Sequence, residues 1–359
     1  MIVFYLPDLR AGGAERVMLN LLTYFAKQGM SDVALLLGKK EGNLLCQVPD
    51  NISVFSLNSS SAKSSVIPLV KFCRNYKPDL IFGTLGASLA LALAKPFIPS
   101  KTKVINRLGN TIGAEKLLYT NLLKRKFYLL ANYIIAKMSS KLIFQCDYMA
   151  KDFLRETGVC NLNYKVIYNP VDIQRIEQMS QESIDRKYDF VAVGRLDIQK
   201  DYFTLLEAAN ILKKRKCNFT IAILGDGILH EKIEIKIAEY GLKNNVFILG
   251  YVQNPYPYIR NAKFLLSSSL YEGFSNVIIE ALCLGTPVIA SDCPGGNKET
   301  INIDNGMLFP VQDLEQMANT IEKGLIDSSS FDSIGIAKLA CEKYGIDIIA
   351  KQYIEVLQK

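Results

Sequence analysis

The sequence predicts an α/β protein with two doubly wound parallel-sheet domains, and two observations support this class. The chain has 359 residues, 49% of them hydrophobic, which is long for one ordinary domain and sufficient for two hydrophobic cores. Short apolar strands alternate with amphipathic helices, and a polar stretch after Asn169-Pro170 interrupts the alternation. We therefore expect a first domain at residues 1–170 and a second at residues 171–342.

The first domain begins with an apolar strand, a glycine-rich turn and an amphipathic helix. The strand covers residues 1–6, the turn at residues 11–14 contains Gly12 and Gly13, and the helix covers residues 15–27. A Gly-Gly turn that opens onto a helix lets the backbone approach a ligand closely. It does not match the dinucleotide motif G-x-G-x-x-G, and a simple tight turn is the alternative.

The rest of the first domain continues the alternation of strands and helices. Asn106 and Arg107 end one of these strands, and polar side chains at that end of a parallel strand face the ligand crevice. The expected elements are strands at residues 33–37, 54–57, 79–82, 103–107 and 165–172, a serine-rich loop at 59–65, and a helix at 66–76.

Charge is distributed unevenly along the chain. Residues 1–170 contain 22 Lys+Arg and 10 Asp+Glu, a net charge of +12, whereas the remainder contains 20 and 25, a net charge of −5. Basic residues concentrate at 116–138, KLLYTNLLKRKFYLLANYIIAKM, among Leu, Tyr and Phe. This segment is typical of an interfacial helix on anionic lipid, and the alternative is a core helix with a basic edge. No nucleic-acid-binding motif accompanies it, so we expect no nucleic-acid partner.

Other features indicate a cytoplasmic protein. The amino terminus lacks a basic-then-apolar signal with a cleavage site. The most apolar run, residues 80–94, is too short for a membrane span and predicts a strand, a turn and a packed helix. The eight cysteines show no C-x-x-C pair and no metal-ligand spacing, which indicates buried thiols in a reducing compartment.

The second domain repeats the alternation and places two cations after its first strand. Arg195 and Lys200 lie five residues apart on one loop. A guanidinium and an ammonium there could hold a diphosphate and neutralise the charge that grows on a leaving phosphate, with two solvated charges as the alternative. The expected strands cover residues 190–193, 220–224, 246–249, 264–267, 287–291 and 306–309. The expected helices cover residues 203–214, 229–240 and 346–357, and two further helices begin at residues 276 and 313.

Residues 271–285, YEGFSNVIIEALCLG, carry two carboxylates around a predicted helix start. Ser275 occupies the expected N-cap position, and Gly285 follows the last helical turn. Glu272 then precedes the helix, and Glu280 lies one turn inside it. Free N–H groups, a positive helix end and two carboxylates suit a ligand with a phosphate and a hydroxyl-rich sugar. The alternative is a capped helix with a solvated glutamate at each end.

Five motifs follow one another in the sequence: Gly-Gly after the first strand, Gly-Arg-Leu with a lysine five residues after the arginine, Leu-Gly-Asp-Gly, Leu-Gly-Tyr, and Glu-Gly-Phe-Ser-Asn with a second glutamate eight residues after the first. The ordered set resembles the family-4 retaining glycosyltransferases of GT-B fold, in particular bacterial members that build surface polysaccharide, lipopolysaccharide or lipid-linked oligosaccharide. The resemblance covers the whole chain and is densest at residues 193–299. It implies two Rossmann-like domains across a cleft, the first binding the acceptor and the second the nucleotide sugar. It also implies that a terminal helix at residues 343–359 crosses back to the first domain.

The resemblance implies roles for individual residues. Glu280 would hold the ribose hydroxyls of the nucleotide, and Glu272 would face the donor sugar near its reacting carbon. Arg195 and Lys200 would neutralise the diphosphate, so Glu272, Arg195 and Lys200 are the catalytic candidates. The other implied donor contacts are Gly13 near the phosphates, Gly250, Tyr251 and Val252 beside the base, and Phe274, Ser275, Asn276 and Val277 against the sugar and distal phosphate.

The activity implied by the resemblance is transfer of a hexose or N-acetylhexosamine from a nucleotide sugar, UDP-linked, with retention and an α-glycosidic bond. The acceptor would be a lipid-linked saccharide or lipopolysaccharide, and the protein would be peripheral on the cytoplasmic face of the inner membrane. No metal or other cofactor is expected, in keeping with the absence of an Asp-x-Asp motif from the sequence.

The sequence departs from the family at one position. Many members carry a histidine near the donor sugar in the first domain, whereas the only histidine here is His230, at a helix start in the second domain, where we expect a surface role. Asn106 and Arg107 occupy the corresponding segment and are candidate contacts for the donor sugar or an acceptor phosphate.

Two other classes of function stay open. A GT-B epimerase would need acidic catalytic groups where this chain has Arg195 and Lys200, and a phosphorylase would need a pyridoxal-binding lysine and a larger chain. A nucleotide-sugar sensor or scaffold would bind the donor without transferring it. The presence of both glutamates and both cations argues against such a decayed site.

Overall fold

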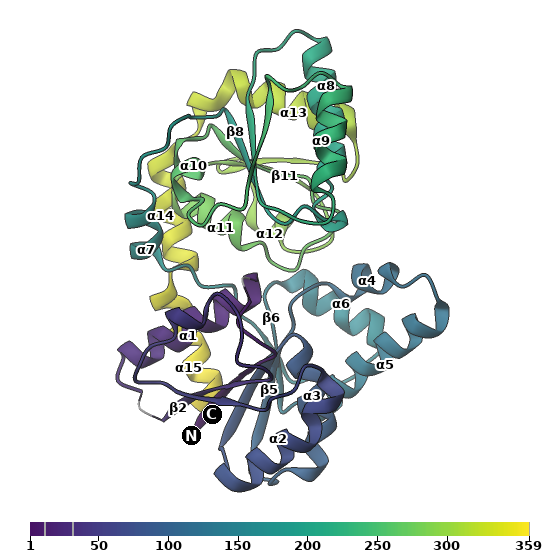
Figure 1. Ribbon diagram of the computed structural model, residues 1–359, viewed down its shortest axis with the longest axis vertical. Helices are drawn as coiled ribbons and strands as arrows, with labels where there is room; N and C mark the ends of the chain where they lie inside the picture. The colour runs from purple at the N-terminus through teal and green to yellow at the C-terminus, as the bar shows by residue number, and fades with distance from the viewer. Residues whose placement is uncertain (11, 31, 359) are drawn as a thin grey trace. The chain divides into compact units, whose positions relative to one another are not determined.

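The computed structural model describes residues 1–10, 12–30 and 32–358, and the chain forms two compact α/β units (Figure 1). Unit 1 contains Met1–Pro170 together with the C-terminal segment that begins at Ile346, and unit 2 contains Val171–Gly345. Each unit is built on one parallel sheet with helices, which confirms the predicted α/β class. Ala11, in the expected glycine-rich turn, lies outside the described residues.

The sheet of unit 1 has the strand order β3-β2-β1-β4-β5-β6-β7, and the pairings are parallel. The carboxyl ends of parallel strands meet at one edge, so the turn after β1 and the polar end of β5 belong to the same edge. The strands are β1 (Ile2–Leu6), β2 (Val33–Leu37), β3 (Ser53–Ser56), β4 (Leu80–Thr84), β5 (Lys103–Arg107), β6 (Lys141–Phe144) and β7 (Tyr164–Val166).

Helices cover both faces of this sheet, and one of them comes from the end of the chain. Helix α15 packs beside α1 in unit 1 (Figure 1), where the ring centroids of Tyr353 and Phe82 are 5.7 Å apart. Tyr353 is fully buried, so the last helix supplies part of this core. The helices are α1 (Gly13–Lys27), η1 (Leu45–Gln47), α2 (Ala62–Tyr76), α3 (Gly86–Ala94), η2 (Lys95–Phe97), α4 (Ile112–Glu115), η3 (Lys116–Leu118), α5 (Leu122–Met138), α6 (Asp147–Thr157) and α15 (Ile346–Gln358).

Three sequence expectations for unit 1 are wrong in detail. The serine-rich loop ends earlier, because the side chains of Ser61 and Ser64 form a capping box that starts α2 at Ala62. The strand expected at 165–172 is β7 and stops at Val166. The segment 116–138 is not one helix, since the chain leaves helical geometry between η3 and α5.

Unit 2 contains a sheet with the strand order β10-β9-β8-β11-β12-β13, again with parallel pairings. The order reverses between β8 and β11, and ligands of open α/β sheets bind at such a switch point. The strands are β8 (Phe190–Val193), β9 (Ile221–Leu224), β10 (Val246–Gly250), β11 (Phe264–Ser267), β12 (Val288–Ser291) and β13 (Gly306–Phe309).

The helices of unit 2 pack on this sheet and on one another. Helices α8 and α13 share a core with β8 and β11, in which the rings of Phe190 and Phe264 stack at 6.3 Å. Helix α14, which the sequence analysis did not predict, packs against α11. The helices are α7 (Ile173–Met179), η4 (Ile198–Lys200), α8 (Tyr202–Lys214), α9 (His230–Glu239), α10 (Tyr256–Asn261), α11 (Asn276–Cys283), α12 (Asn297–Thr300), α13 (Leu314–Asp327), η5 (Ser328–Ser330) and α14 (Ser333–Tyr344).

Candidate active site

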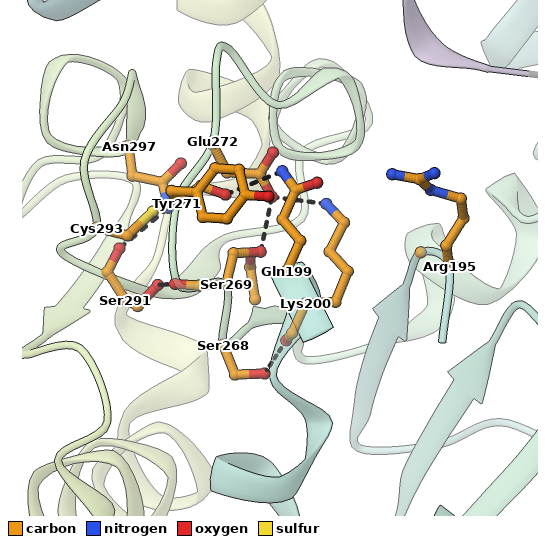
Figure 2. Close-up of polar contacts among 12 residues, drawn as sticks. Arg195, Gln199, Lys200, Ser268, Ser269, Tyr271, Glu272, Ser291, Cys293 and Asn297 are labelled. Atoms are coloured by element: carbon orange, nitrogen blue, oxygen red, sulfur yellow. Dashed lines mark hydrogen bonds and ion pairs between the residues drawn. The ribbon is translucent and has the colours of Figure 1, made fainter. Parts of the chain in front are cut away.

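A lysine and a glutamate meet at the switch point of unit 2. Lys200 ends η4, just after β8, and Glu272 lies in the loop that follows β11. Because β8 and β11 are neighbours, their loops emerge side by side at the carboxyl edge of the sheet. The Nζ atom of Lys200 lies 2.6 Å from Oε1 of Glu272 (Figure 2).

The lysine–glutamate pair is held by hydrogen bonds on both sides. The side chain of Glu272 is 8% exposed and that of Lys200 is 19% exposed. The Ser269 hydroxyl donates to Oε1 of Glu272 at 2.6 Å, and the Ser268 hydroxyl donates to the backbone oxygen of Lys200 at 2.8 Å. Hydrogen bonds and burial therefore hold both charged groups in place.

The loop after β12 supports Glu272 from the other side, and the sequence analysis did not single it out. The backbone N–H of Glu272 donates to the Pro294 oxygen at 2.9 Å. Gly295 has a φ of +139°, and a Cβ there would collide with the Glu272 carbonyl. A Cβ on Gly296 would collide with the Phe274 ring. The Pro-Gly-Gly sequence was the available signal, because adjacent glycines after a strand permit such a close approach.

A second set of polar side chains lies behind the pair and was also missed. The Ser291 hydroxyl donates to the Ser269 oxygen at 2.6 Å, and Asn297 Nδ2 donates to the Ser291 oxygen at 3.0 Å and to Cys293 Sγ at 3.4 Å (Figure 2). Burial, and then the negative charge of Glu272, raises the pKa of Cys293 to about 12, so this residue remains a thiol. These residues connect β11, β12 and α12 into one support for Glu272.

Arg195 pairs with Asp197 and not with Lys200 or Glu272. Its guanidinium lies 3.2 Å from Asp197 Oδ2, its side chain is 74% exposed, and Figure 2 draws no interaction from it to Lys200 or Glu272. An exposed arginine on this loop can change rotamer at low cost, so it is available to a ligand.

The helix α11 has the start and end that the sequence predicted. Ser275 is at the N-cap position but makes no side-chain cap hydrogen bond, and Gly285 has a φ of +78° just after the helix. Glu280 lies one turn inside, where its Oε1 accepts from the Tyr256 hydroxyl at 3.4 Å. Asn276 and Val277 begin α11 and are half-buried, so the helix start remains partly accessible.

The residues expected around the donor base and sugar differ in exposure. Tyr251 follows β10 and is 66% exposed, and Val252 is half-buried. Phe274 is buried, and its ring centroid lies 5.8 Å from that of Tyr344 at the end of α14. Gly250 has a φ of +70°, which explains a glycine at this turn. Tyr251 is therefore the candidate with a ring free to stack on a base.

Three candidates lie in unit 1. Gly13 is the first residue of α1 and is exposed. Asn106 and Arg107 are buried, and they contact different elements: Asn106 Nδ2 donates to Ser139 Oγ at 2.9 Å, and Arg107 Nη2 donates to Asn169 Oδ1 at 2.5 Å. Nε and Nη1 of Arg107 are buried without a hydrogen-bond partner in the described chain, so this guanidinium retains donor capacity.

His230 has the surface position that the sequence predicted. It begins α9, its side chain is 34% exposed, and Nδ1 lies 2.8 Å from Asp226 Oδ1. The hydrogen bond to Asp226 raises the pKa of His230. In the described ranges no group of three or more His, Cys, Asp or Glu side chains has a metal-binding arrangement.

An exposed apolar and basic surface covers η3 and the first half of α5; we call it the α5 surface. Leu122 is 71% exposed, Leu123 60% and Phe127 61%. Lys116 does not contribute a free charge, because it forms an ion pair with Glu156. Among the described helices none is long and apolar enough to cross a membrane. The members of the α5 surface are the exposed Leu117, Leu118, Leu122, Leu123, Phe127, Leu130, Lys124 and Lys126 and the half-buried Arg125.

Comparisons with known proteins show the family of this chain. The family model described as "Glycosyltransferase Family 4" matches residues 11–175, and the one described as "Glycosyl transferases group 1" matches residues 174–338. An N-acetylgalactosamine-N,N'-diacetylbacillosaminyl-diphospho-undecaprenol 4-alpha-N-acetylgalactosaminyltransferase of Campylobacter jejuni is 26% identical over 339 residues, which cover 90% of this chain and 89% of the relative. A lipopolysaccharide 1,6-galactosyltransferase of Salmonella typhimurium is 31% identical over 166 residues, 44% of this chain and 45% of the relative.

Solved structures give the same fold. The crystal structure of Anabaena HepE in complex with UDP and glucose matches with a TM-score of 0.80 and 21% identity, and the match covers 100% of this chain and 99% of that one. Two units that are each built on one parallel sheet, together with this likeness, show the GT-B fold. The chain belongs to the family-4 glycosyltransferases.

Proposed function

We propose that this glycosyltransferase moves a hexose or N-acetylhexosamine from a UDP-sugar to a lipid-linked saccharide or lipopolysaccharide, with retention of the anomeric configuration and formation of an α bond. The observation that carries the proposal is the buried Lys200–Glu272 pair at the switch point of unit 2. The names of the relatives support the acceptor class, since one acts on a diphospho-undecaprenol-linked sugar and another on lipopolysaccharide. The UDP complex of the Anabaena protein supports the nucleotide.

In this proposal the donor diphosphate takes the place of Glu272 as the partner of Lys200. Arg195 turns from Asp197 to the same diphosphate, because phosphate offers a bidentate partner with more charge than one carboxylate. Glu272 then accepts a hydrogen bond from a hydroxyl of the donor sugar near its reacting carbon. Glu280 holds the ribose hydroxyls, and the other donor contacts are the base-flanking Tyr251 and Val252, and Phe274, Ser275, Asn276 and Val277 at the start of α11.

The transfer step breaks one bond and forms one bond at the anomeric carbon. The bond from this carbon to the β-phosphate oxygen breaks, and the acceptor hydroxyl oxygen forms the new bond on the same face. The leaving phosphate oxygen takes the acceptor proton, so no protein base is needed. Negative charge grows on this phosphate, and Lys200 and Arg195 stabilise it there. We propose that these two cations do this without a metal ion.

Unit 1 supplies the acceptor side of the proposed reaction and one contact of the donor. Gly13, the proposed contact of the donor phosphates, begins α1, where backbone N–H groups favour an anion. The unpartnered nitrogens of Arg107 suit an anionic group of the acceptor or a hydroxyl of the sugar. Asn106 is the second candidate on β5, with a buried Oδ1 that has no hydrogen-bond partner in the described chain.

The α5 surface is proposed to hold the enzyme on an anionic membrane, at the cytoplasmic face of the inner membrane, where lipid-linked acceptors would be presented. Exposed leucine and phenylalanine side chains can enter the headgroup region, while Lys124 and Lys126 contact anionic lipid. The sequence of residues 116–138 contains no acidic residue that would oppose this contact.

A donor screen tests the proposed function. The purified protein is incubated with single UDP- or GDP-sugars, with and without a lipid-linked saccharide pool, and free nucleotide is measured. We expect UDP release that depends on both one UDP-sugar and the acceptor, and loss of this release in Lys200→Ala. Donor binding without turnover on any acceptor pool would indicate a sensor, and release of a GDP product alone would contradict the proposed nucleotide.

A further inference from the structure

Two cysteines face each other where α11 packs against α14 in unit 2. Cys283 is the last residue of α11, and Cys341 lies near the end of α14. The Sγ of Cys341 lies 3.7 Å from the backbone oxygen of Cys283, to which its thiol donates. The two thiols are also close enough for each to shift the pKa of the other. Thiols this close on two packed helices need little movement to reach disulfide distance.

The two thiols have different environments. Cys283 is buried, whereas Cys341 is half-buried and accessible to a small reagent. The hydrogen bond from the Cys283 thiol lowers the pKa of Cys341, because it stabilises the thiolate there. The pKa of Cys283 is raised by that same neighbour and by burial. The pair thus combines an attacking thiol with a protected second thiol, which is the arrangement of an oxidisable dithiol.

We propose that Cys283 and Cys341 form a redox modification site, at which a small disulfide such as oxidised glutathione converts the pair into a disulfide that weakens donor binding. The Cys341 thiolate attacks one sulfur of glutathione disulfide and releases one glutathione thiolate. The Cys283 thiol loses its proton and attacks the Cys341 sulfur of the mixed disulfide, which releases the second glutathione. Two protein thiols are oxidised, and one glutathione disulfide is reduced to two thiols.

The expected effect on donor binding follows from the position of Cys283 in α11, and this part rests on the proposed function. A disulfide holds its sulfurs about 2.0 Å apart, so its formation draws α11 and α14 together, and we expect a small shift or rotation of α11. Glu280, the proposed ribose contact, lies three residues earlier in the same helix. A small movement of α11 displaces the Glu280 carboxylate from the ribose and lengthens its 3.4 Å contact with the Tyr256 hydroxyl.

The full-length protein is oxidised in buffers of increasing glutathione disulfide and then examined by peptide mass spectrometry and UDP calorimetry. We expect a cross-linked peptide pair that contains Cys283 and Cys341, and a several-fold rise in the Kd for UDP that dithiothreitol reverses. Cys341→Ser should lose both changes. Cys46→Ser and Cys160→Ser, which remove exposed thiols, should keep both.

Two results would overturn the inference. The first is a Cys283 peptide that stays reduced while the exposed Cys46 and Cys160 are glutathionylated. The second is a formed cross-link with an unchanged Kd for UDP. Reduced protein that fails to bind UDP at all contradicts the proposed function instead, and the cross-link is still measured independently in that case.

Discussion

The Nζ atom of Lys200 lies 2.6 Å from Oε1 of Glu272, although the two residues are 72 positions apart in the sequence. The family resemblance implies that the lysine binds the phosphate and the glutamate the sugar, as two separate contacts. The structure pairs the two side chains with each other. In the proposed function Lys200 exchanges Glu272 for the donor diphosphate, and the free energy of this exchange contributes to donor affinity.

Replacing Glu272 by glutamine removes the negative charge of the side chain and keeps an oxygen that can accept a hydrogen bond. Glu272→Gln can still accept from the Ser269 hydroxyl, so the fold should be retained. We expect kcat to fall by about 10²–10³-fold, the range found when one preorganised group is removed from an active site. The Kd for UDP should stay equal or decrease, because Lys200 loses a competing carboxylate. Steady-state kinetics and calorimetry measure the two effects.

A matched control and a contrary result complete this test. Glu239→Gln removes a carboxylate on the exposed face of α9 and should leave both constants unchanged. If Glu272→Gln weakened UDP binding and left kcat intact, Glu272 would act in nucleotide recognition, and its assignment to the sugar would be wrong.

Glu280 and Tyr256 should differ in their effect on donor affinity. Glu280→Ala removes the proposed ribose contact, and we expect the KM for the donor to rise by at least about tenfold, which corresponds to losing one hydrogen bond to a charged group. Tyr256→Phe removes only a hydroxyl at 3.4 Å from Oε1 of Glu280, so a rise of about threefold or less is expected. Equal effects of the two variants on KM would show that Tyr256 itself contacts the nucleotide.

The α5 surface predicts how membrane binding responds to apolar and to basic changes. Leu122→Glu combined with Leu123→Glu places two charges on exposed apolar positions and should abolish flotation with anionic liposomes at low salt. UDP binding should be unchanged, because α5 belongs to unit 1 and the proposed donor residues other than Gly13 lie in unit 2.

Lys116→Gln is the control for this experiment. Lys116 pairs with Glu156, so its removal should reduce flotation less than Lys124→Gln, which removes an exposed charge. Wild-type protein that does not float at low salt would contradict the proposed membrane contact.

The lowered pKa of Asp189 should make part of the stability of unit 2 sensitive to acid. Burial raises the pKa of this carboxyl, but ion pairing with Lys263 and hydrogen bonds from Thr220 outweigh burial and lower it overall. A lowered native pKa gives stability that is fully present above the unfolded pKa and is lost as the pH falls through the native pKa. Asp189→Asn should therefore lower the melting temperature by about 2–4 °C at pH 7, equivalent to about 1 kcal/mol.

The difference between Asp189→Asn and the wild type should shrink as the pH falls from the unfolded pKa of 3.8 through the lower native pKa, because the native carboxyl becomes protonated over that range. Thermal melts at a series of pH values measure this convergence. A constant difference across the series would show that the aspartate acts through shape and hydrogen bonding alone.

The sequence predicted the strands that carry the site better than the contacts that support it. Buried parallel strands such as β8 and β11 are short apolar runs, and the polar residues after them mark the carboxyl edge. The start and end of α11 were predictable because Gly285 permits the positive φ that ends the helix. These signals are local, so a single sequence contains them.

The missed features depend on contacts between distant segments. Ser269 resembles any loop serine, and only the fold brings it to Glu272 and brings Ser291 to Ser269. The sequence predicted an interfacial helix at residues 116–138, but only the fold shows which of its leucines are exposed, since the same leucines would suit a buried helix. The helix α2 began earlier than expected because a serine cap was taken for a loop.

The anomeric configuration of the product is the most direct test of the central claim that the Lys200–Glu272 site performs retaining transfer. The product made from an α-linked UDP-sugar and a lipid-linked acceptor is isolated, and its new linkage is determined from the anomeric proton signal in an NMR spectrum. We predict an α linkage in the wild-type product and only trace product from Glu272→Gln. A β linkage, or a Glu272→Gln variant as active as the wild type, would contradict it.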